Sequence, residues 1–190
     1  MKSRTFAWAA RITALLVLTV SVNARAQSWA NKTFRGVIDG YTPQTTTGPY
    51  EMHGPWCVKV RRDGKRADFY AALNMELSDG WVITKNNYDF TPSQRGAHTH
   101  HITLGNAEVT PIANGFELTG KASFTLNGGP APTTVAPSDV VITITGGSDI
   151  EYSNFSLTFV KPGSNHFGPL PIPGVVKSVK EEGAPPKGER

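Results

Sequence analysis

Hydrophobic and polar residues alternate with a period of two along much of this chain. The clearest run lies between residues 116 and 126. Its apolar side chains share one parity, and they are Phe116, Leu118, Ala122, Phe124 and Leu126. The opposite parity holds Glu, Thr, Lys and Ser. Because successive side chains of a strand point to opposite faces, this run predicts a β-strand with one dry and one solvated face.

Similar runs recur at regular spacing between turn signals such as Asp63-Gly64 and Gly146-Gly147. The run Ala67 to Leu77 is the one place where a helix competes, because Ala, Leu, Met and Glu are good helix formers. The even spacing of the turns favours a strand there. Many short strands with frequent turns predict an all-β, antiparallel domain. We expect a single β-sandwich, jelly-roll-like or related, and the alternative is a closed β-barrel.

The N-terminus has the three parts of a secretory signal peptide. Basic residues come first, then the uncharged apolar run Ile12 to Val22, then small residues at Ala24 and Ala26. An apolar run of this length is shorter than the ~20 residues that a membrane-spanning helix needs. We therefore predict cleavage after Ala26 and a soluble, exported protein with no membrane span in the mature chain. Its expected location is periplasmic or extracellular.

Three segments follow from these patterns: a signal peptide at 1–26, one β domain at 27–176 and a disordered tail at 177–190. The tail prediction rests on its lack of apolar periodicity. The signal peptide holds four of the 19 basic residues and no acidic residue, so the mature chain has 15 basic and 15 acidic residues. Such a balance offers no basic field for nucleic acid, and we predict no nucleic-acid partner.

Recognised catalytic motifs are missing from the sequence. It contains no G-x-S-x-G, H-E-x-x-H, phosphate-binding loop or dinucleotide fingerprint, and Cys57 is its single cysteine. This pattern favours a non-enzymatic module that binds a partner or surface, with a protein, a glycan or another surface ligand as the expected class of partner. It leaves the identity of the ligand and the oligomeric state open.

A cluster of histidines supports a different hypothesis. The run Ala97 to Leu104 reads AHTHHITL, and the strand period places His98 and His100 on one face and His101 on the other. A His-x-His pair on a strand can offer two imidazoles to Zn²⁺ or Cu²⁺, which need at least one more ligand. We predict His98, His100 and His166 as the metal-binding set, with His53 as another source of a third ligand. The alternative is a hydrogen-bonded pair of histidines at the rim of the domain.

Overall fold

A computed structural model of the chain describes residues 29–42, 50–77, 98–131, 136–146 and 152–183. The predicted signal peptide lies outside these residues, as does the end of the predicted tail. The strands are β1 (Lys32–Thr42), β2 (Tyr50–Val60), β3 (Arg66–Leu77), β4 (His98–Ile112), β5 (Gly115–Leu126), β6 (Gly129–Pro130), β7 (Ser138–Thr145), β8 (Asn154–Phe159) and β9 (Ile172–Glu181). One short helix, α2 (Ser164–Phe167), lies between β8 and β9.

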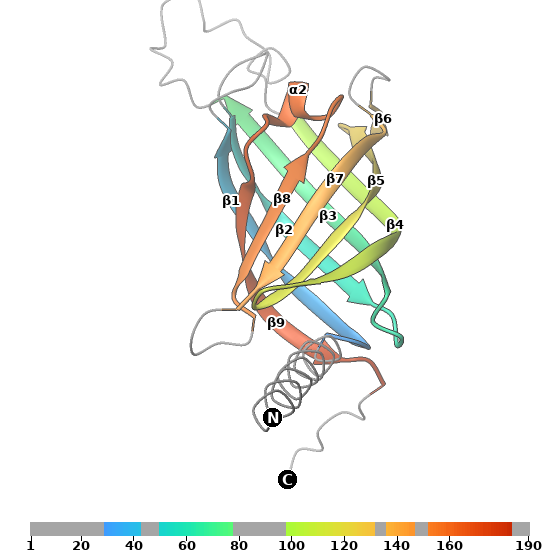
Figure 1. Ribbon diagram of the computed structural model, residues 1–190. Coiled ribbons are helices and arrows are strands. Elements are labelled where there is room, and N and C mark those ends of the chain that lie inside the picture. Colours follow the sequence, from blue (N-terminus) through green and yellow to red (C-terminus); the bar gives the residue numbers. More distant parts are fainter. Residues whose placement is uncertain (1–28, 43–49, 78–97, 132–135, 147–151, 184–190) are drawn as a thin grey trace, which may run out of the picture.

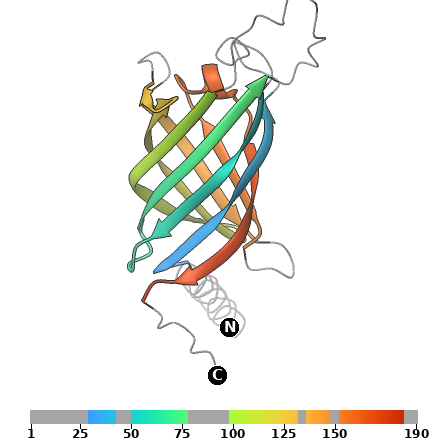
Figure 2. The ribbon, with the colours of Figure 1, turned by 180° about the vertical axis from the view of Figure 1, so that it is seen from behind.

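The long strands form one closed, antiparallel barrel (Figures 1 and 2). Each long strand pairs with the next long strand in sequence, and β9 returns to pair with β1. The pairing of β4 with β5 completes the ring of eight strands, while the short β6 forms a hairpin with the end of β5. Closure leaves no long strand of the ring with an unpaired edge. The all-β, antiparallel prediction is confirmed, and the chain adopts the closed barrel that was the alternative rather than the expected β-sandwich.

The period-two alternation of the sequence becomes the inside and outside of the barrel. In β5, Phe116, Leu118, Ala122 and Phe124 are buried, while Lys121 and Ser123 between them are exposed. The segment that also resembled a helix forms β3, whose buried side chains include Phe69 and Leu73. These inward side chains fill the interior, as expected for an eight-stranded barrel. Burial of this apolar surface is the main driving force for the fold.

Strand β9 continues past the predicted boundary at residue 176 and ends at Glu181. Residues 177–181 carry mostly exposed side chains, so the apolar pattern that marks the other strands is missing there. Their backbone instead pairs with β1, where Lys32 lies opposite Glu181. Beyond the strand, Asn31 Nδ2 donates a hydrogen bond of 2.8 Å to the carbonyl oxygen of Glu182. Backbone pairing rather than side-chain burial therefore extends the domain.

Within the described part of the chain, no helix is both long and apolar enough to cross a membrane.

Candidate metal centre

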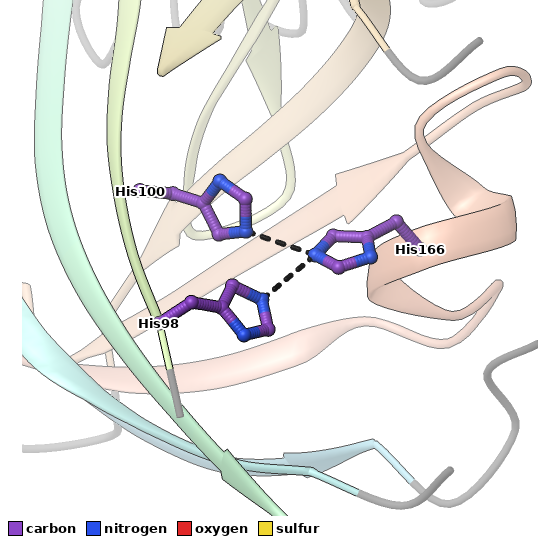
Figure 3. Close-up of side chains that lie close together, drawn as sticks. All are labelled: His98, His100 and His166. Carbon is purple, nitrogen blue, oxygen red and sulfur yellow. Dashed lines mark hydrogen bonds between the residues drawn. The ribbon is translucent and has the colours of Figure 1, made fainter. Parts of the chain in front are cut away.

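Two of the three predicted ligands, His98 and His100, lie at the start of β4 and project toward the inside of the barrel (Figure 3). His100 is 1% exposed, and Ile102 and Leu104, which share its parity, are also buried. The strand is held on both sides at this point. Asn74 of β3 lies opposite Thr99 in register, and the backbone N–H of Thr99 donates to Asn127 Oδ1 at 2.9 Å. The pairing of β4 thus fixes the face on which the two imidazoles lie.

The third predicted ligand, His166, comes from α2, which lies at one end of the barrel (Figure 1). Ser138 of β7 holds the residue before α2 in place, because its Oγ accepts a hydrogen bond of 3.0 Å from the backbone N–H of Gly163. A Cβ at residue 163 would lie 2.6 Å from that Oγ, so glycine permits the close approach. Phe167 follows His166 and is fully buried. These contacts fix α2 against the barrel with His166 directed toward β4.

The three imidazoles converge on one another (Figure 3). The Nε2 atom of His166 lies 2.8 Å from Nε2 of His100 and 3.0 Å from Nε2 of His98. The three potential ligand nitrogens all lie within 4.8 Å of one another. Two nitrogens bound to one Zn²⁺ at ~2.0–2.1 Å would be about 3.3 Å apart in a tetrahedral site and at most about 4.2 Å apart. The two Nε2–Nε2 distances at His166 are about 0.3–0.5 Å shorter than this tetrahedral spacing, so the rings would have to move apart to hold one ion.

A backbone carbonyl selects the tautomer of His100. Its Nδ1 lies 2.6 Å from the carbonyl oxygen of Thr125, and because a carbonyl can only accept, Nδ1 must carry the hydrogen. In the neutral ring, Nε2 then presents a lone pair toward His166. Metal-binding histidines commonly donate their other ring N–H to a carbonyl or carboxylate, which orients the ring and fixes its tautomer. Thr125 makes the same contact here.

The hydrogens available to neutral imidazoles do not match the short contacts at His166. Because Nε2 of His100 is an acceptor, Nε2 of His166 must donate its single hydrogen to satisfy the 2.8 Å contact. The 3.0 Å contact with His98 must then share that hydrogen or bring two N–H groups together. A metal ion among the three rings would resolve this conflict, since it would accept one lone pair from each nitrogen.

Electrostatics keep two of these rings neutral near pH 7. Burial lowers the pKa of His100 to about 3, against a smaller opposing effect of its hydrogen bond to Thr125. Burial, together with a smaller effect of the neighbouring His98, lowers the pKa of His166 to about 4. A metal ion competes with protons for the imidazole lone pair, so neutral rings are the form that binds it.

Aromatic side chains form the inner wall of the cluster. The ring of Phe167 lies 4.9 Å from that of His100 and stacks on Phe159 at 3.9 Å between centroids. Phe124 packs edge-on against Phe167 at 5.2 Å. On another side, the Tyr50 ring meets His98 edge-on at 5.4 Å. The histidine rings therefore pack against aromatic side chains, which restrict their rotation.

The two other histidines lie outside this cluster. His101 is exposed on the outer face of β4, as the strand period predicts, and its ring lies 6.1 Å from that of Tyr70. His53, the other candidate for a third ligand, is exposed on β2, where its Nδ1 lies 3.0 Å from Asp39 Oδ1. Of the two sources considered for a third ligand, the structure brings His166 to the pair and not His53.

Sequence reasoning missed two contributors to the site. Thr125 acts through its backbone carbonyl, which no side-chain pattern can reveal. Tyr50 falls in a stretch rich in Thr, Gly and Pro, which reads as a loop, yet it is the first residue of β2 and is buried. The alternation of Met52, Trp56 and Val58 after it was the sequence signal that could have indicated a strand, and all three side chains are buried in the structure.

Comparison with known proteins found no matching family model, no matching curated protein and no matching solved structure.

Proposed function

We propose that this protein binds one divalent transition-metal ion, Zn²⁺ or Cu²⁺, through Nε2 of His98, His100 and His166. The convergence of the three Nε2 atoms is the observation that carries the proposal. Imidazole nitrogen suits both metals, whereas Mg²⁺ and Ca²⁺ prefer oxygen ligands. Of the two hypotheses that the sequence left open, the geometry favours the metal-binding one.

The tautomer of His100 and the burial of the cluster support the proposal in different ways. The hydrogen bond to Thr125 orients the lone pair on Nε2 of His100 before an ion binds, and the packing of Phe167 against His100 holds that ring in place. Both features reduce the entropy and reorganisation that binding would otherwise cost. A binding role is also compatible with the expectation of a non-enzymatic exported module, because metal binding does not require catalysis.

Equilibrium dialysis of untagged, chelator-treated protein against Zn²⁺ and, separately, Cu²⁺ tests the proposal. We expect one ion per chain for at least one of the metals. His100→Asn keeps a side-chain N–H near the position of Nδ1 but removes the Nε2 ligand, and it should abolish stoichiometric binding. His101→Asn makes the same change one residue away on the outer face and should bind like the wild type. Equal binding by both variants, or no binding by the wild type, would refute the proposed function.

A further inference from the structure

We propose that this metal centre keeps one coordination position for an exogenous ligand, which is a water molecule at rest and is replaceable by a small anion. The inference rests on the proposed function, because it concerns the coordination shell of the same ion. Zn²⁺ in proteins is usually four-coordinate, and three protein ligands with one open position are the arrangement of its catalytic sites.

The supply of imidazole and thiolate ligands in the chain ends with these three histidines. The sequence has five histidines and one cysteine, and all six lie within the described residues. His53 and His101 are exposed on outer faces of the barrel. Cys57 lies on β2 between the buried Trp56 and Val58, so its side chain points outward as well. A further imidazole or thiolate donor at the centre must therefore come from outside the chain.

Carboxylate ligands from the described residues do not complete the shell either. Among those residues, the group of histidine, cysteine and carboxylate side chains close enough to share an ion contains only His98, His100 and His166. All three ligands are neutral when they bind a metal, so the ion would keep its full double positive charge. A cation in that state attracts anions and polarises a bound water strongly.

Access to the centre is one-sided. His100 is buried against Phe167, and Phe124 and Phe159 lie behind that ring, so aromatic side chains of the described residues cover the interior side of the centre. His98 and His166 are only partly buried. A ligand from solvent therefore reaches the ion from their side. The Tyr50 ring lies on this side as well, 5.4 Å from the ring of His98 and 6.1 Å from that of His166.

Cobalt substitution tests the open position directly, because the visible bands of Co²⁺ report its coordination shell. The untagged protein is loaded with Co²⁺ and titrated with sodium azide, then with sodium acetate. We expect a saturable spectral change with one azide bound per cobalt, as azide replaces water and the water leaves. His101→Asn should give the same titration. His100→Asn should bind no cobalt, and circular dichroism shows whether it keeps its strands.

The outcomes separate the two proposals. Stoichiometric cobalt whose bands do not respond to azide or acetate would overturn the open position and leave metal binding intact. A wild-type protein that binds neither Co²⁺, Zn²⁺ nor Cu²⁺ would overturn both. If His100→Asn retains cobalt together with the azide response, the responding ion lies elsewhere, and the inference for this centre is wrong.

Discussion

Acid should destabilise the metal-free protein through the buried histidines, and His100→Asn should remove a defined part of that effect. The folded protein holds the pKa of His100 at about 3 and that of His166 at about 4, against 6.5 for each in the unfolded chain. As the pH falls below about 6.5, the unfolded chain takes up protons that the folded chain does not. Stability therefore decreases from about pH 6.5 down to about pH 4 through His166, and down to about pH 3 through His100.

The size of the effect follows from the same pKa values. A pH of about 5 lies about 1.5 pH units below the pKa of a histidine in the unfolded chain. Protonation therefore stabilises the unfolded chain by roughly 1.4 kcal/mol per unit, or about 2 kcal/mol for each histidine. His100 is almost completely buried and should contribute all of this. His166 is partly exposed, so its contribution is smaller, and the pair together should destabilise the fold by roughly 3 kcal/mol relative to pH 7.5.

Urea denaturation at about pH 7.5 and pH 5, with a chelator present throughout, measures this difference. The informative quantity is the change in the free energy of unfolding between the two pH values, because it cancels the packing change that the substitution itself causes. His100→Asn should reduce that change by about 2 kcal/mol. His101→Asn, at the neighbouring exposed position, should not alter it. If His100→Asn and the wild type lose the same stability on acidification, His100 is not held neutral by burial.

Three further predictions concern the metal and the turn that carries His166. Zn²⁺ at about 100 times its dissociation constant should stabilise the wild type by about 2.7 kcal/mol and raise Tm by roughly 5–10 °C in scanning calorimetry, with no shift in His166→Asn. Phe167→Ala should lower the free energy of unfolding by about 3–5 kcal/mol in urea denaturation and weaken zinc binding, while Phe167→Leu should lower it less. Equal losses of stability in the two variants would contradict the packing role of the ring. Ser138→Ala leaves the buried N–H of Gly163 without its acceptor, so it should cost about 1–3 kcal/mol and raise the zinc dissociation constant; an unchanged constant would show that this contact does not position His166.

The sequence predicted the strands better than their arrangement. Alternation is a local property, and Phe116, Leu118 and Phe124 are buried as their parity requires. A sandwich and a barrel both bury one face of each strand, so alternation cannot choose between them. The choice depends on the pairing of β1 with β9, where exposed side chains give no periodic signal and the backbone provides the contacts.

The site was predictable only as far as the strand period extends. The period placed His98 and His100 together and His101 opposite, and the structure agrees. His166 lies 66 residues beyond His100, and its approach depends on the turn at Gly163 and on the burial of Phe167. The proximity of His166 to the pair therefore results from tertiary packing, and no local pattern in the sequence predicts it.

The most direct test of the metal centre is crystallographic. Crystals of the untagged protein grown with Zn²⁺ are measured on both sides of the zinc absorption edge, and the anomalous difference map locates the ion. We predict one strong peak at ~2.0–2.1 Å from Nε2 of His98, His100 and His166. Zinc bound instead beside His53 and Asp39, or no peak near the three histidines in zinc-saturated crystals, would contradict the central claim.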